Sequence, residues 1–301
     1  MSETSSLDLA TRIENCLALG ALGDWLGSAI EGAPLSSRRL DRKAGGLTDD
    51  TILTLATARA IAFCGRVDPE QVAVHLLAAF RSGVPGMGSS TLGAMKALAA
   101  GQHWALSGIA GDRVARNGAA MRIAPLAFVL DLWNERGRQL ILDVARITHR
   151  NDEAITGAIA FAAGIRLALE SELDRTEALT KVASLLPDTR VRDAVLEASQ
   201  LGDVAPRDAA SQVGSSGFVV ESVPLALYLG LSRPTSAIDA IETAILVSED
   251  ADTVGSMVGQ LLGAAGHCLQ EGAPVMRYLP GDLGQLAKDI AALEDRPSES
   301  A

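Results

Sequence analysis

Apolar residues recur every three or four positions along most of the chain, in stretches rich in alanine and leucine. This spacing is typical of helices that bury one face, whereas strands alternate apolar and polar residues and favour β-branched and aromatic side chains. Aromatic residues make up only 3% of the sequence. We therefore predict an all-α fold with about a dozen helices. They are expected over residues 7–30, 49–63, 69–81, 91–100, 118–134, 138–148, 153–171, 175–186, 190–201, 218–230, 236–247, 252–270 and 283–293.

The chain has no linker of the length that separates domains. With 301 residues and 48% apolar content, it can bury a large core. We expect a single domain over residues 1–295, followed by a polar, disordered tail over residues 296–301.

Acidic residues outnumber basic ones by 37 to 26, which gives a formal net charge of −11 at pH 7. This balance argues against sequence-independent binding of nucleic acid, which needs a basic surface. Three scattered cysteines without CxxC spacing fit buried thiols in a reducing compartment. Because the N-terminus lacks a signal-peptide pattern and no apolar run reaches membrane-spanning length, we expect a soluble, cytoplasmic protein with no membrane partner.

Two predicted helix starts carry paired carboxylates beside hydroxyls: Thr48-Asp49-Asp50-Thr51 and Asp250-Ala251-Asp252-Thr253. Either could be a capped helix start and no more, since these side chains stabilise helix N-termini, and the glycines that follow the second could serve close packing. Taken together, four aspartates and two threonines supply the hard oxygen ligands that Mg²⁺ prefers. If the two segments converge in space, a pair of divalent cations would offset the repulsion between the carboxylates.

Further polar residues allow both a structural and a functional interpretation. Asp24 can hydrogen-bond a neighbouring helix, Glu31 can reach a cavity or stay on the surface, and His149 can contact a ligand or cap a helix end. Two loop-to-helix segments can offer backbone N–H groups to a diphosphate or serve as turns. They contain Gly86, Met87, Gly88, Ser89 and Ser90 in the first segment, and Asn117 and Gly118 in the second.

In order and spacing, these motifs resemble the ADP-ribosylglycohydrolase family, which includes the dinitrogenase-reductase-activating glycohydrolases and the animal ADP-ribosylarginine and ADP-ribosylserine hydrolases. The resemblance spans residues 13–266 and rests on Gly23-Asp24-Xaa-Xaa-Gly27 with Glu31, Thr48-Asp49-Asp50-Thr51, Asn117-Gly118-Ala119-Ala120-Met121-Arg122 with Pro125, Thr148-His149, and Asp250-Xaa-Asp252-Thr253. It implies an orthogonal all-α bundle around a binuclear centre of two Mg²⁺ or Mn²⁺ ions. The metal ligands it implies are Thr48, Asp49, Asp50, Asp250, Asp252 and Thr253.

The sequence also departs from the family pattern. Ser248, Glu249 and Ala251 stand where two glycines and a threonine are usual, which predicts a stiffer or differently hydrogen-bonded loop. Gly86 stands where arginine-directed relatives carry an aspartate. Since a carboxylate can bind a guanidinium in a bidentate manner and glycine cannot, Gly86 favours an oxygen-linked acceptor over arginine.

The resemblance implies hydrolysis of the bond between the anomeric carbon of ADP-ribose and an acceptor, through an oxocarbenium-like transition state and with ADP-ribose as product. We expect Glu31 to act as general acid or base and Asp49 and Asp50 to take part through the metals. Residues 86–90, Asn117, Gly118 and His149 would bind the substrate. The acceptor could be a protein arginine or serine, a nucleic-acid end or a small molecule.

Two alternatives stay open at this point. One is an all-α, Mg²⁺-dependent enzyme of isoprenyl diphosphates, although the ten aromatic residues are few for a pocket that stabilises carbocations. The other is a family member that binds ADP-ribose or serves a structural role without catalysis.

Overall fold

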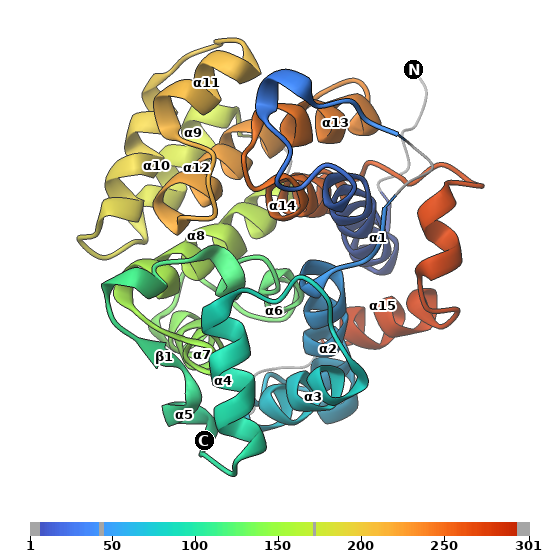
Figure 1. The fold of residues 1–301 in the computed structure, drawn as a ribbon, viewed down its shortest axis with the longest axis vertical. Coiled ribbons are helices and arrows are strands. Elements are labelled where there is room, and N and C mark those ends of the chain that lie inside the picture. Colours follow the sequence, from blue (N-terminus) through green and yellow to red (C-terminus); the bar gives the residue numbers. More distant parts are fainter. Residues whose placement is uncertain (1–6, 42–44, 171–172, 294–301) are drawn as a thin grey trace.

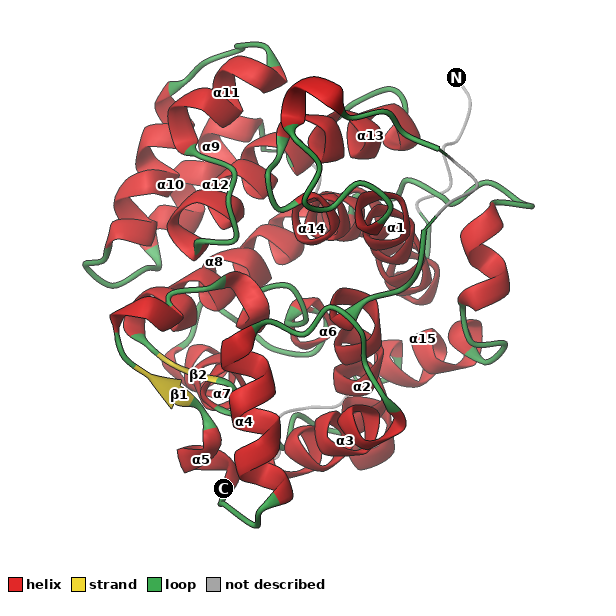
Figure 2. Ribbon diagram, in the orientation of Figure 1, coloured by secondary structure: helices red, strands yellow, loops and turns green. Residues whose placement is uncertain are grey.

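The computed structural model describes residues 7–41, 45–170 and 173–293. These residues form fifteen α-helices and one sheet of two short parallel strands (Figure 2), which confirms the predicted all-α class. The tail predicted over residues 296–301 lies outside the described residues. The longer helices are α1 Leu9–Ser28, α2 Asp49–Cys64, α3 Pro69–Ser82, α4 Ser89–Ala99, α7 Glu135–Arg146, α8 Asp152–Leu169, α9 Arg175–Ser184, α10 Arg190–Gln200, α11 Pro206–Val213, α12 Val219–Gly230, α13 Ala237–Val247, α14 Ala251–Ala264 and α15 Leu283–Ala291.

Helices α1 and α14 lie side by side although they come from opposite parts of the chain (Figure 1). Glycines let their backbones touch: a Cβ atom at Gly23 would lie 2.0 Å from the Gly255 carbonyl oxygen, and one at Gly259 would lie 2.1 Å from the Leu19 carbonyl oxygen. No side chain fits at such distances. The glycines of α14 therefore serve close packing, and this packing places the N-terminal end of α14 beside the C-terminal end of α1.

The remaining helices surround this pair. The almost entirely buried α8 packs against α12 and α14 and leads to α9 and α10 on one side of the molecule (Figure 1). On the other side, α2 contacts α1 and also α3 and α15. None of the described helices is both long and apolar enough to cross a membrane.

The helix predicted over residues 118–134 is wrong. A 3-10 turn, Asn117–Ala119, and the four-residue α6, Ala124–Ala127, occupy this stretch. Pro125 has no N–H group for a longer helix, and Asp131 accepts a hydrogen bond from the Trp133 N–H (2.9 Å), which fixes a turn instead. Residues 118–128 are all buried, so their apolar content resembled that of a helix.

The helix predicted over residues 252–270 is too long, because α14 ends at Ala264. Gly266 adopts a left-handed backbone (φ +103°) and the His267 N–H donates to the Leu262 carbonyl, a common way to end a helix. The pattern also missed α11, α5 (Trp104–Ser107) and both strands, β1 (Ile109–Ala110) and β2 (His149–Arg150). His149 thus pairs with Ile109 in a strand and does not lie at a helix end.

Candidate metal and substrate site

Three helices bring carboxylates to one point. Asp24 of α1, Asp50 of α2 and Asp252 of α14 each place one oxygen within 4.8 Å of the others. A second group, formed by Glu31, Asp250 and Asp252, meets the same limit. Because Asp252 belongs to both groups, the two possible cation positions are neighbours. The convergence of residues near 50 with residues near 252 agrees with the prediction from the sequence.

Asp24 is fully buried and its carboxylate organises the start of α2. It accepts hydrogen bonds from the Thr48 N–H (2.9 Å) and hydroxyl (2.8 Å), and from the Thr51 N–H (3.1 Å) and hydroxyl (2.5 Å). These bonds occupy both oxygens, so Asp24 is better suited to orient α2 than to ligate a cation. The structure thus agrees with the interpretation of Asp24 as a hydrogen-bonding partner of a neighbouring helix. Its membership in the acidic cluster was missed.

Asp50 differs from Asp24 because one of its oxygens has no partner. Its Oδ2 atom accepts from the Thr253 hydroxyl (3.1 Å) and lies 3.3 Å from the Thr48 hydroxyl, whose proton goes to Asp24; Oδ1 is buried and has no hydrogen-bond partner among the described residues. A buried, unsatisfied carboxylate oxygen is costly, and a cation is the partner that such an oxygen fits best. The residues present therefore fit a divalent metal ion.

The electrostatics point the same way. Burial, followed by Asp252, raises the pKa of Asp50 well above its ordinary value. Burial, followed by Asp250, raises the pKa of Asp252 to about 8, and burial raises the pKa of Asp250 to about 6 although Asn117 opposes the shift. Like charges brought together in a buried site repel each other, and a bound cation would compensate them.

Glu31 is the exposed member of the cluster. Its Oε2 atom accepts a hydrogen bond from the Ala251 N–H (2.9 Å), which ties the chain after α1 to the start of α14. The described residues provide no partner for its other oxygen. Glu31 thus lies at the surface and also within reach of Asp250 and Asp252, and its role as general acid or base stays a prediction.

Asp49 belongs to neither group of three carboxylates, so its role as a metal ligand stays a prediction. Burial, followed by Asp24, raises its pKa to about 7, and a backbone hydrogen bond from Gly88 opposes the shift. The loop before α4 lies against it, since a Cβ atom at Gly86 would be 3.0 Å from Asp49 Oδ1. Gly86 itself has a left-handed backbone (φ +85°).

The first predicted diphosphate-binding segment forms the start of α4. Gly88 is its N-cap without any side-chain cap, and Ser89 and Ser90 occupy the first helical turn. Such an uncapped N-terminus leaves backbone N–H groups for an anion. Met87 is half-buried beside them.

The second predicted segment meets the first. A Cβ atom at Gly118 would lie 2.9 Å from the Thr91 hydroxyl and 3.0 Å from Cε1 of His149. Asn117 donates to Asp250 Oδ2 (2.5 Å) and to the Ser222 hydroxyl (3.1 Å), so in this structure it holds a carboxylate of the cluster. The predicted substrate-binding residues therefore lie beside the predicted metal ligands.

The sequence analysis did not find Arg38, which fixes the loop before Asp250. This buried guanidinium donates to the carbonyls of Ile245 (3.1 Å), Ser248 and Glu249 (3.0 Å) at the end of α13. The loop has further hydrogen bonds, because the Asp250 N–H donates to the Ser215 carbonyl (3.1 Å). A local sequence pattern cannot predict a contact between residues more than two hundred positions apart.

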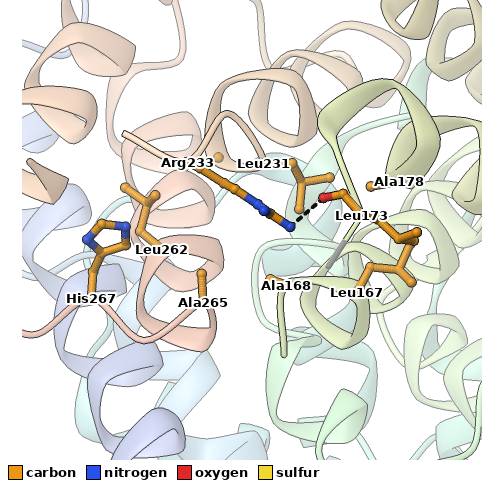
Figure 3. Close-up of a pocket in the computed structure, with 10 residues that line it drawn as sticks. Leu167, Ala168, Leu173, Ala178, Leu231, Arg233, Leu262, Ala265 and His267 are labelled. Carbon is orange, nitrogen blue, oxygen red and sulfur yellow. Dashed lines mark hydrogen bonds between the residues drawn. The ribbon is translucent and has the colours of Figure 1, made fainter. Parts of the chain in front are cut away.

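A separate cavity of about 310 Å³ lies where α8, α12 and α14 end (Figure 3). Its walls are mostly aliphatic, and Arg233 crosses it to donate to the Leu173 carbonyl (2.6 Å). None of the described residues that line it carries a carboxylate. This cavity is therefore distinct from the acidic cluster.

Known proteins provide an independent comparison. The chain is 30% identical over 266 residues to the ADP-ribosylarginine hydrolase Tri1 of Pseudomonas putida, which covers 81% of this chain and 67% of the relative. It is 23% identical over 313 residues to the ADP-ribosylhydrolase ARH3 of Gallus gallus, with 84% of each chain covered. A solved structure described as an ADP-ribosylglycohydrolase-related protein complex has the same fold, with a TM-score of 0.73 and 23% identity over 95% of this chain and 99% of that chain.

The sequence model of the family described as ADP-ribosylglycohydrolase matches residues 5–297, nearly the whole chain. This match decides against the alternative of an isoprenyl-diphosphate enzyme. The chain belongs to the ADP-ribosylglycohydrolases, a family of enzymes that hydrolyse glycosidic bonds of ADP-ribose.

Proposed function

We propose that this protein uses two divalent cations, Mg²⁺ or Mn²⁺, to hydrolyse the bond between ADP-ribose and an acceptor at the cluster around Asp50 and Asp252. The observation that carries the proposal is the buried Oδ1 atom of Asp50, which lacks a partner and lies among carboxylates that repel each other. The proposed ligands are Thr48, Asp49, Asp50, Asp250, Asp252 and Thr253. Asp24 orients the start of α2 beside them.

When bound, the cations would supply Lewis-acid polarisation and charge compensation. The residues of the chain would transfer the proton and bind the substrate. Glu31 is exposed and uses one oxygen to accept from Ala251, so its other oxygen can move a proton. In the balanced reaction, the bond between the anomeric carbon and the acceptor breaks, water adds its oxygen to that carbon, and one proton of the water ends on the acceptor.

The substrate would extend from the cluster toward the meeting point of the two loop segments. The uncapped N-terminus of α4 and the backbone at Gly118 would hold the diphosphate, with His149 beside them. In an acidic protein, helix N-termini and cations have to supply most of the attraction for that dianion.

For the acceptor, we propose an oxygen-linked group, because Gly86 brings no carboxylate for a guanidinium. The Tri1 relative of Pseudomonas putida is named for ADP-ribosylarginine, so the two linkages need direct comparison. A Gly86→Asp variant is unsuited to this comparison. Residue 86 has a left-handed backbone, and a Cβ atom there would lie 3.0 Å from Asp49 Oδ1, so the aspartate would strain the loop. The ratio of kcat/KM values on serine-linked and arginine-linked ADP-ribose peptides decides the matter in the wild-type protein.

Turnover of both peptides with Mg²⁺, with Mn²⁺ and with EDTA tests the proposed reaction. We expect release of ADP-ribose only with metal. Glu31→Gln should lower kcat by about two to four orders of magnitude while ADP-ribose affinity changes little, because a proton-transfer group acts on the transition state. Glu197→Gln, an exposed position on α10, is the matched control.

Two results would contradict the proposal. Absence of turnover on every linkage, with ADP-ribose still bound, would indicate a non-catalytic binding member of the family. A near-normal kcat for Glu31→Gln would remove Glu31 from the mechanism.

A further inference from the structure

Arg122 is a fully buried cation whose guanidinium is only partly satisfied. Its Nη2 atom donates to the Val144 carbonyl (3.1 Å) and to the Thr148 hydroxyl (2.9 Å). Its Nε and Nη1 atoms have no hydrogen-bond partner among the described residues. An apolar side chain of similar length would fill the same space without this desolvation cost. The contact with Thr148 is therefore the feature that calls for an explanation.

Thr148 connects Arg122 to His149. The Thr148 Oγ1 atom lies 2.9 Å from Nδ1 of His149 and 3.5 Å from the Ala145 carbonyl oxygen. Because the Thr148 oxygen accepts from the Arg122 cation, its hydroxyl becomes a better donor and a poorer acceptor. The contact with the Ala145 carbonyl, at 3.5 Å, is at the limit of a hydrogen bond. The Thr148 hydroxyl should therefore donate its proton to Nδ1, which leaves the ring proton of His149 on Nε2.

The other side of the ring faces the predicted diphosphate site. A Cβ atom at Gly118 would lie 3.5 Å from Nε2 of His149 and 2.9 Å from the Thr91 hydroxyl. Only a glycine fits between these two groups, so they border one small space at the start of the Asn117–Ala119 turn. The described residues offer no hydrogen-bond partner for Nε2.

We propose that Arg122 is a positioning residue, which acts through Thr148 to hold His149 neutral with its proton on Nε2, so that Nε2 donates to a phosphate oxygen of ADP-ribose. This inference rests on the proposed function for its ligand, but the arrangement of protons exists without the ligand. Burial, followed by the charge of Arg122, lowers the pKa of His149 to about 3, which agrees with a neutral ring.

The proton position can be read by NMR of the protein labelled with ¹⁵N-histidine, because protonated and unprotonated ring nitrogens have different shifts. In the ligand-free wild type at pH 7, we expect Nε2 to be protonated and Nδ1 to be unprotonated. Thr148→Val keeps the shape but removes the hydroxyl, and should give a mixture of tautomers. Thr148→Ser should restore the wild-type signal, and Arg122→Met should resemble Thr148→Val.

Calorimetry with ADP-ribose supplies the second measurement. Loss of one well-placed hydrogen bond to a charged group predicts an affinity about tenfold weaker or more for Thr148→Val. Thr57→Val is the matched control, because Thr57 is equally buried and its hydroxyl donates to the Leu53 carbonyl within α2. It should leave both the tautomer and the affinity as in the wild type.

A wild-type ring protonated on Nδ1 would overturn the inference, and so would a Thr148→Val protein with an unchanged tautomer. If Arg122→Met fails to fold, the two Thr148 variants still decide. A wild-type protein that shows the expected tautomer but binds no ADP-ribose would contradict the proposed function and the named ligand. The positioning of His149 by Arg122 through Thr148 would still stand.

Discussion

At the scale of single residues, Asp24 and Asp50 show two opposite ways to bury a carboxylate. Asp24 is surrounded by donors from Thr48 and Thr51, whereas Asp50 keeps one oxygen without a partner. Burial raises the pKa of Asp24, and the hydrogen bonds from Thr51 and Thr48 oppose this shift from within the protein. The second charge is stabilised fully only when something from outside the chain binds, which makes Asp50 the better reporter of metal binding.

Asp50→Asn should therefore separate stability from metal binding. In EDTA, the variant should be at least as stable as the wild type, because it removes one of several charges that repel each other. Saturating Mg²⁺ should stabilise the wild type by about 2.7 kcal/mol at about a hundred times its Kd, and the variant much less. Thermal unfolding of both proteins, with the exposed Asp193→Asn as control, measures the difference. An equal Mg²⁺ effect on all three proteins would place the metal elsewhere.

His149 predicts a pH dependence of stability. Its pKa of about 3 in the folded protein lies below the ordinary value of 6.5, so between these values the unfolded chain binds a proton that the folded protein does not. Stability should thus fall as the pH drops below 6.5, by up to about 1.4 kcal/mol per pH unit from this group. His149→Gln should remove that part of the slope in urea unfolding between pH 7 and 5. Above pH 7 the difference in unfolding free energy between the wild type and His149→Gln should be constant. If the stabilities of both proteins decline in parallel below pH 7, the prediction is contradicted.

At the scale of elements, the contact between α1 and α14 sets the geometry of the site. Asp24 lies next to Gly23, and a Cβ atom at Gly27 would be 2.4 Å from the Cα atom of Asp252. The small face of each helix therefore decides how close the carboxylates come. Any residue that pushes the helices apart also separates the carboxylates.

Gly259→Ala tests this dependence, because its new Cβ atom would meet the Leu19 backbone at 2.1 Å. We expect a loss of stability of about 1–3 kcal/mol, as for other overpacked cores, together with weaker Mg²⁺ binding. Gly284→Ala is the control: it is also helical, in α15, but its nearest neighbour is the end of the Glu14 side chain at 3.3 Å. The control should be neutral or slightly stabilising, since alanine favours helix. Chemical unfolding and calorimetry would measure both effects, and a Gly259→Ala protein with unchanged Mg²⁺ affinity would uncouple the packing from the site.

The sequence predicts secondary structure and site residues where neighbouring residues along the chain are enough to decide them. Helical spacing located most helices, and oxygen-ligand chemistry linked Asp50 to Asp252. The prediction failed at residues 118–134, because a run of buried residues, here 118–128, looks alike in a helix and in packed turns. It also could not find the roles of Asp24 in the cluster or of Arg38 in the loop, since their partners depend on how distant helices pack. The remaining ligand assignments, Asp49 among them, stay predictions.

At the scale of the whole molecule, the site joins the first two long helices to α14, while α9, α10 and α11 contribute none of the clustered carboxylates. Removal of metal should therefore weaken the structure unevenly. We expect faster amide hydrogen exchange in α1, α2 and α14 after treatment with EDTA, and little change in α10. Hydrogen exchange followed by mass spectrometry would show the pattern. A uniform acceleration across all helices would indicate that metal acts on global unfolding alone.

The pairing of α1 with α14 also matters during synthesis of the protein. The backbone surface around Gly23 and Gly27 is translated more than two hundred residues before the helix that covers it. A nascent chain therefore holds half of its site without the other half while the residues between them are translated. By the same logic, if the chain is divided in the loop before Pro206, neither fragment contains a complete cluster, and activity can return only when the two fragments associate.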